Sequence, residues 1–97
     1  MATYLALLNW TDQGVRNVKE APGRARRAAE LAEQTGCKLV AVFMTMGPYD
    51  LAARLEAPDD TAVARFMLAL GALGNVRTTT MKAFTMEEFE AIVGSLP

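Results

Sequence analysis

Two stretches of this sequence have the composition of β-strands but are apolar on both faces. Successive side chains of a strand point to opposite faces of its sheet, so each stretch divides into two alternating sets. In residues 3–10 the two sets are Tyr4, Ala6, Leu8 and Trp10 on one side and Thr3, Leu5, Leu7 and Asn9 on the other. In residues 39–46 they are Val40, Val42, Met44 and Met46 against Leu39, Ala41, Phe43 and Thr45. A sheet built from such strands needs a cover on both faces, and this requirement constrains the fold most.

The segments around these two strands alternate between helix and strand. Residues 24–35 carry alanines at helical spacing and stop at Gly36, which indicates a helix with a narrow apolar face. After residues 39–46, the dipeptide Gly47-Pro48 predicts a turn, and residues 49–57 return as the second strand of a hairpin.

The second half of the chain repeats the alternation. Asp59 or Asp60 caps a second helix, and residues 75–84 are rich in β-branched residues and predict a fourth strand. Thr85 followed three residues later by Glu88 has the form of a capping box and predicts a short third helix.

The resulting order, β-α-β-β-α-β-α, favours an α+β fold of the ferredoxin-like βαββαβ type with a short C-terminal helix. Right-handed crossovers then give a four-stranded antiparallel sheet with both main helices on one face. We expect the helix-free face to pack against a second copy of the chain, forming a homodimer or higher homo-oligomer, with the C-terminal helix as the competing cover. The expected polar minority of this face is Asp50, Arg54, Glu56, Arg77 and Thr79.

Charge and composition argue against several classes of partner and cofactor. The net charge is −1, and no strand combines basic and aromatic residues, so neither nucleic acid nor a membrane surface is an expected partner. The chain has no histidine, and Cys37 is its only cysteine, which leaves no usual ligand set for zinc or copper. We therefore expect no metal and no cofactor. The lone cysteine and the lack of a signal-like or spanning segment favour a cytoplasmic protein.

Three stretches, residues 7–14, 45–50 and 74–80, resemble the GYD domain family, which is named for a Gly-x-Tyr-Asp motif. Gly47, Tyr49 and Asp50 match that motif. The resemblance covers nearly the whole chain and implies a single GYD-type domain over residues 1–97, similar in fold to the dimeric α+β barrel proteins. It carries no catalytic residues with it.

The candidate binding residues are Trp10, Tyr49, Asp50 and Arg77. The motif has a structural interpretation as a tight turn, and a functional one in which Tyr49 and Asp50 face a pocket or a subunit interface. Because strand 49–57 is expected to run opposite to strand 3–10, we expect Tyr49-Asp50 and the loop at residues 9–13 to lie toward opposite ends of the sheet within one subunit.

Two functions follow from these features. The first is a homo-oligomeric module that is non-catalytic or binds a small apolar ligand. The alternative is a cofactor-independent enzyme of the α+β barrel type, an isomerase or monooxygenase, with an apolar pocket between sheet and helices. An enclosed pocket with Tyr49, Asp50 or Arg77 pointing inward would favour the enzyme. One basic cluster is either a solvated face or an anion site: Arg16, Lys19, Arg24, Arg26 and Arg27.

Overall fold

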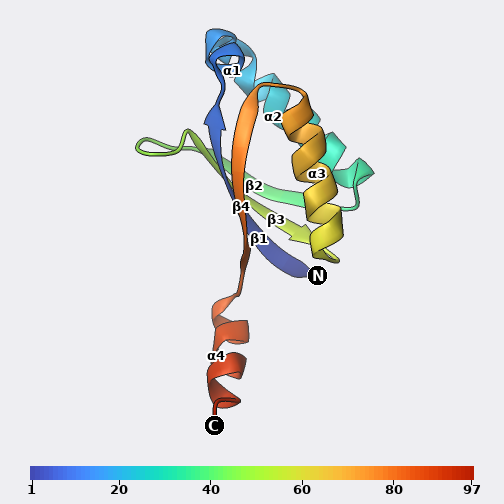
Figure 1. Cartoon of the computed structure of the whole chain (residues 1–97), viewed down its shortest axis with the longest axis vertical. Coiled ribbons are helices and arrows are strands. Elements are labelled where there is room, and N and C mark those ends of the chain that lie inside the picture. The colour runs from blue at the N-terminus through green and yellow to red at the C-terminus, as the bar shows by residue number, and fades with distance from the viewer.

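The computed structural model describes all residues, 1–97, and confirms the predicted fold class (Figure 1). Its elements, in chain order, are β1 (Ala2–Trp10), α1 (Asp12–Arg16), a 3₁₀ turn (Val18–Glu20), α2 (Ala21–Gln34), β2 (Lys38–Met44), β3 (Leu51–Ala57), α3 (Asp60–Ala72), β4 (Val76–Ala83) and α4 (Met86–Gly94). The four strands form one sheet in the order β2-β3-β1-β4, with every neighbouring pair antiparallel.

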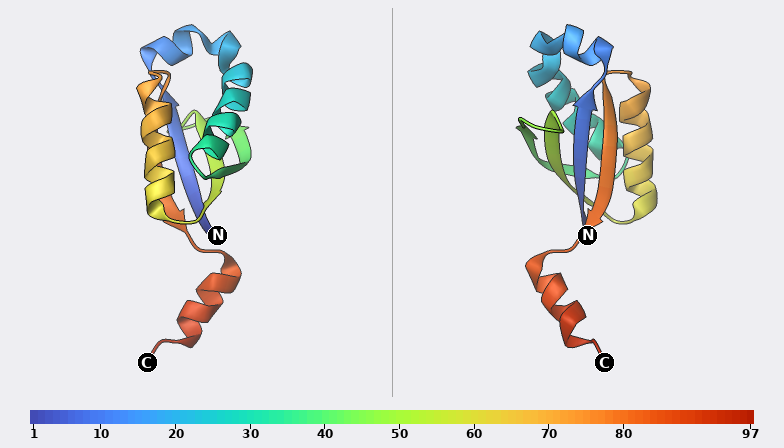
Figure 2. Two further views of the ribbon diagram at one scale, coloured as in Figure 1. Left: turned by 90° about the vertical axis from the view of Figure 1, so that its right-hand side faces the viewer. Right: turned by 60° about the vertical axis from the view of Figure 1, so that its left-hand side comes forward.

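Helices α2 and α3 lie over the same face of this sheet, as the two views of Figure 2 show. The core lies beneath them. Tyr4, Ala6 and Leu8 of β1 are buried there, and Leu55 of β3 and Phe66 of α3 are the largest completely buried side chains. One alternating set of each strand thus faces the helices, and the other set faces away from them.

Strand β2 departs from simple alternation. Its register with β3 shifts between Leu39 and Ala41, because Val40 has no partner of its own across the ladder. Such a bulge places Leu39, Val42 and Met44 on the same, helix-covered side. The expectation that Leu39 and Val42 lie on opposite faces is wrong, because the bulge interrupts the alternation of this strand.

The segment between β1 and α2 is also more regular than expected. Part of the loop expected at residues 9–13 is helical, because Thr11 caps the short helix α1 by accepting a hydrogen bond from the Gly14 N–H. Helix α2 then begins at Ala21 instead of residue 24, with Pro22 in its first turn, where a missing N–H costs nothing.

Helix α4 carries the predicted capping box. The Thr85 hydroxyl accepts from the Glu88 N–H at 3.1 Å, and the Glu88 carboxylate accepts from the Thr85 N–H at 2.9 Å. The helix projects beyond the end of the sheet, next to the N-terminus, and lengthens the molecule to 52 Å (Figure 1). Within one chain, α4 therefore does not cover the helix-free face of the sheet.

Candidate functional site

The three stretches that carry the family resemblance meet at one end of the sheet. The end of β1, the start of β3 and the start of β4 are neighbours there, since Leu8 pairs with both Leu51 and Thr78. The expectation that Tyr49-Asp50 and residues 9–13 lie at opposite ends is wrong. Antiparallel neighbours place the end of one strand beside the beginning of the next, so these segments lie side by side.

Asp50 joins the two segments directly. Its backbone N–H donates to the Leu8 carbonyl at 2.9 Å, and its carboxylate accepts from the Trp10 N–H, also at 2.9 Å. On the other side, Thr45 donates its N–H to the Asp50 carbonyl and its hydroxyl to the Tyr49 carbonyl. The motif aspartate thus fixes a turn and holds it against β1.

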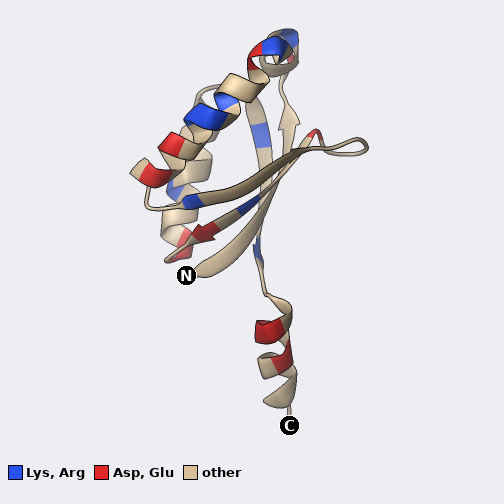
Figure 3. Ribbon diagram, turned by 180° about the vertical axis from the view of Figure 1, so that it is seen from behind, with Lys and Arg blue, Asp and Glu red and all other residues tan.

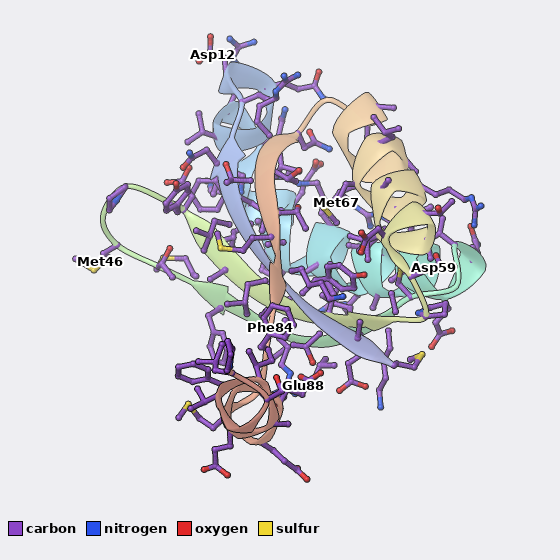
Figure 4. The ribbon with its side chains drawn as sticks, turned by 60° about the horizontal axis from the view of Figure 1, so that its bottom comes forward. Asp12, Met46, Asp59, Met67, Phe84 and Glu88 are labelled. Atoms are coloured by element: carbon purple, nitrogen blue, oxygen red, sulfur yellow. The ribbon has the colours of Figure 1, made fainter.

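Gly47 supplies the unusual backbone conformation of this turn. Its φ is +126°, a region that other residues rarely adopt, and a Cβ there would meet nothing within 4 Å. The glycine is therefore required by the backbone angle and not by close packing. Tyr49 is half-buried beside it, and the loop tip at Met46 lies away from the rest of the molecule (Figure 4).

The α3–β4 connection closes the same end of the sheet. Thr11 donates its N–H to the Asn75 carbonyl at 3.0 Å and its hydroxyl to the Gly74 carbonyl at 2.6 Å. The Gln13 side chain bonds the Asn75 side chain. Gly14 approaches so closely that an added Cβ would lie 2.0 Å from the Asn75 carbonyl oxygen. Residues 9–14 are therefore locked to both neighbouring turns.

Of the basic cluster, Arg24 has a clear structural role. Its guanidinium donates to the Gly14 carbonyl at 3.0 Å and to the Asn17 carbonyl at 2.9 Å, and so binds the C-terminal end of α1 to α2. Its side chain is only 15% exposed. Arg16, Lys19, Arg26 and Arg27 are exposed and make no ion pair within the chain.

A large, open apolar pocket of about 970 Å³ lies between α2, α3 and the covered face of the sheet. Leu8, Ala53 and Leu55 lie at the sheet side, with Leu31 of α2 and Leu70 of α3 on the walls. Its few polar lining residues are Arg24, Arg27, Glu30, Gln34 and Asn75. A surface of this kind suits an apolar molecule better than a strongly polar one.

The predicted binding residues are divided between different surfaces. Trp10 lines the apolar pocket, whereas Tyr49, Asp50 and Arg77 do not. Arg77 pairs with Asn9 across the β1–β4 ladder and is exposed on the helix-free face. The condition that would favour the enzyme, a pocket with Tyr49, Asp50 or Arg77 inside it, is therefore not met.

A second hollow of about 420 Å³ lies between α3 and β4 and was not anticipated from the sequence. The Tyr4 hydroxyl donates there to the Asp60 carboxylate, and this bond, together with burial, raises the pKa of Tyr4 to about 12. Thr80 adds a buried hydroxyl with no hydrogen-bond partner, and Lys82 lies at the same hollow. These residues come from β1, α3 and β4, which meet only when α3 packs on the sheet, so no local sequence signal could have revealed them.

The helix-free face is the other large apolar surface. By register it carries Leu5 and Leu7 of β1, Phe43 of β2 and Met81 of β4. Phe43 is 63% exposed, and Leu5 and Met81 are each more than 40% exposed. The polar side chains on this face include Arg54, Glu56, Arg77 and Thr79, as expected, while Asp50 is committed to Trp10.

Neither a metal cluster nor a spanning helix is present. No three His, Cys, Asp or Glu side chains gather closely enough to hold a metal ion. No helix has the length and apolar character needed to cross a bilayer.

These features define a small α+β protein of the ferredoxin-like type. Comparison with known proteins gives the family. The GYD domain model matches residues 4–93, and the chain belongs to the GYD domain family. It is also 35% identical over 92 residues to a Thermus thermophilus protein named glutamine synthetase and cystathionine beta-lyase binding protein. That alignment covers 94% of this chain and 97% of the relative.

Solved structures share the fold. The crystal structure of TTHA0845 from Thermus thermophilus matches with a TM-score of 0.58 and 23% identity, over 88% of this chain and 95% of that one. FFRP-DM1 matches with a TM-score of 0.58 and 20% identity, over 87% and 100%. The hypothetical protein PHS023 from Pyrococcus horikoshii matches with a TM-score of 0.57 and 18% identity, over 88% and 92%. At these identities the likeness supports the fold and nothing further.

Proposed function

We propose that this chain is a non-catalytic, homo-oligomeric binding module that associates with other proteins in the cytoplasm. The observation that carries the proposal is the helix-free sheet face, which is apolar and has no cover within the chain. A contiguous exposed apolar surface of this kind marks an interaction site more often than a free surface.

Self-association is the first part of the proposal. The helix-free face of one copy packs against the same face of another, so that Leu5, Phe43 and Met81 become buried between two sheets. The interface is isologous, since each copy contributes the same residues. Arg77 contributes to the polar contacts of this interface, and Tyr49 and Asp50 support it indirectly by holding the adjacent turn.

Sedimentation velocity on the full chain tests this part. Leu5→Glu and Phe43→Glu place a charge in the interface and convert the oligomer to monomer. Leu68→Glu is the matched control, because Leu68 is 76% exposed on α3, away from the helix-free face. A wild-type protein that is monomeric at micromolar concentration, with Leu5 accessible, would contradict self-association.

Binding to another protein is the second part. A relative 35% identical over nearly the whole chain is named for binding glutamine synthetase and cystathionine beta-lyase, which supports an enzyme as the partner. Biolayer interferometry of the purified chain against each of these two enzymes, taken from the same organism as the chain, tests it. Saturable binding to either enzyme supports the proposal. If neither enzyme binds at micromolar concentration, this choice of partner is contradicted.

The apolar pocket supports a second candidate function, the binding of a small apolar ligand. The pocket volume of about 970 Å³ is at the upper end of the range of ligand sites. Trp10 lines the pocket and can contact a bound molecule. Calorimetric titration with medium-chain fatty acids and small aromatic compounds tests it. Ala28→Trp on α2 places a bulky side chain in the pocket and should weaken binding, whereas Ala64→Trp, on the exposed part of α3 outside this pocket, should leave binding unchanged.

A further inference from the structure

Helix α4 has an apolar side that nothing in its own chain covers. Phe89, Ile92 and Val93 share one side of the helix at spacings of three and four residues. Phe89 is 51% exposed, and all three project into solvent because α4 lies beyond the end of the sheet (Figure 1). Figure 4 views this end of the molecule, with Phe84 at the point where β4 leads into the helix.

Helix α4 is also too short to be stable by itself. It has nine residues, and helices below about 12–15 residues are marginal in water without tertiary packing. The capping box explains why the helix begins at Met86, but it adds only a fraction of the required stability. A folded α4 therefore implies a surface outside its own chain on which it packs.

The charges of α4 indicate which surface this is. The helix carries Glu87, Glu88 and Glu90 and no basic residue, as Figure 3 shows. Glu88 is engaged in the capping box, which leaves Glu87 and Glu90 free. The helix-free face of the sheet offers both apolar side chains and Arg77, an exposed cation without an ion pair in its own chain. An acidic, amphipathic helix complements such a face.

We propose that α4 of one copy packs onto the Arg77 end of the helix-free sheet face of a second copy, beside the sheet-to-sheet contact, and that the two copies exchange their C-terminal helices reciprocally. The inference rests on the proposed self-association through that face and names the segment that completes it. Phe89 and Ile92 bury their side chains against the partner's sheet, and Glu87 or Glu90 pairs with Arg77 of the partner subunit.

The placement of α4 favours exchange over folding back. Arg77 lies at the start of β4, beside Asn9, and α4 leaves from the opposite end of the same strand. A two-fold axis perpendicular to the strands brings the α4 end of one copy over the Arg77 end of the other. The same symmetry operation then forms both contacts, that of each copy's α4 with the sheet face of the other copy.

Point variants of the full chain separate the helix from the sheet face. Phe89→Glu together with Ile92→Glu should raise the dimer dissociation constant by about tenfold or more in sedimentation equilibrium. Leu68→Glu, which also adds a charge to an exposed apolar position, should leave it unchanged. Hydrogen exchange should show α4 amides protected at high protein concentration and unprotected after dilution to monomer.

A charge exchange tests the ion pair. Arg77→Glu and Glu90→Arg should each weaken the dimer, because each homodimer then sets like charges against each other at both contacts. Mixing the two variants should pair opposite charges at both contacts, one in the native sense and one reversed, and give a heterodimer tighter than either homodimer. For the direct contact, Ile92→Cys on one copy and Asn9→Cys, beside Arg77, on another, both in a Cys37→Ala background, should form a disulfide only in mixed samples.

The outcomes distinguish this inference from the proposed function. One outcome is that Phe43→Glu dissociates the dimer, the α4 substitutions leave its dissociation constant unchanged, and the α4 amides exchange freely. This outcome overturns helix exchange and leaves the proposed sheet interface standing. A wild-type monomer overturns both. A monomer with protected α4 amides shows that α4 folds onto its own sheet, which also overturns the exchange.

Discussion

Asp50 pairs with Trp10 across the end of the β1–β3 ladder, its carboxylate accepting the Trp10 N–H at 2.9 Å. Because the Asp50 backbone N–H also donates to the Leu8 carbonyl, one residue provides two successive links between the strands. The side chain supplies the second link, beyond the first residue of β3. The aspartate of the family motif thus extends the sheet at this end.

Asp50→Ala should lower the free energy of unfolding by about 1–3 kcal/mol, because it leaves the Trp10 N–H without its partner in a half-buried position. Asp50→Asn keeps a side-chain acceptor and should cost less. Urea denaturation followed by Trp10 fluorescence measures both. Equal stability of Asp50→Ala and wild type would mean that water replaces the carboxylate without loss.

Gly14→Ala should also destabilise the protein, by about 1–3 kcal/mol, because the new Cβ would lie 2.0 Å from the Asn75 carbonyl oxygen and the backbone must move. Gly71→Ala is the matched control. Nothing lies within 4 Å of a Cβ at that helical position, so the substitution should raise stability by about 0.5–1 kcal/mol. Thermal unfolding of the two variants should shift in opposite directions.

Stability should fall with rising pH in the range where Tyr4 titrates differently in the two states. Its pKa is about 12 when folded and 10.0 in an unperturbed chain, so the unfolded state loses the proton first. Below pH 10 both states keep the proton, and the titration of Tyr4 contributes no pH dependence. Between pH 10 and 12 deprotonation favours the unfolded state.

Tyr4→Phe should lack the part of the decline in stability between pH 10 and 12 that the titration of Tyr4 causes. Tyrosinate difference absorbance of the native protein should likewise lose its highest-pH step in this variant. The same slope of stability against pH in Tyr4→Phe and wild type would show that other groups cause the decline.

Cys37 should resist thiol reagents in the folded protein. It is only 4% exposed, and burial raises the pKa of its thiol, which lowers the fraction of reactive thiolate. Reaction with a disulfide reagent at neutral pH should be slow in buffer. In concentrated urea it should be rapid and consume one thiol per chain. Rapid reaction in buffer would indicate frequent local opening between α2 and β2.

Much of the fold could be predicted because its signals are local. The capping box of α4, the alanine face of α2 and the turn at Gly47-Pro48 are all readable over a few residues. Two local features were missed. Helix α1 has only five residues, so its cap and first turn look like a polar loop, and the bulge at Val40 leaves no mark in a run that is apolar throughout.

The candidate site was harder to predict because it depends on which segments meet. The contact of Asp50 with Trp10 could have been deduced, since antiparallel neighbours bring those strand ends together. The two hollows could not, because the spacing of α2 and α3 over the sheet sets their size. Likewise, the position of α4 depends on the path of the chain after Ala83, which the amphipathic pattern of the helix does not specify.

The strand order has a consequence for how the chain reaches its folded state. Strand β1 lies in the interior of the sheet, and its pairs with β4 join residues about 80 positions apart, such as Thr3 with Ala83. Neither half of the chain can complete the sheet alone. Folding therefore depends on slow, non-local pairing, and a chain cut before β4 should lose the whole structure and not merely an edge.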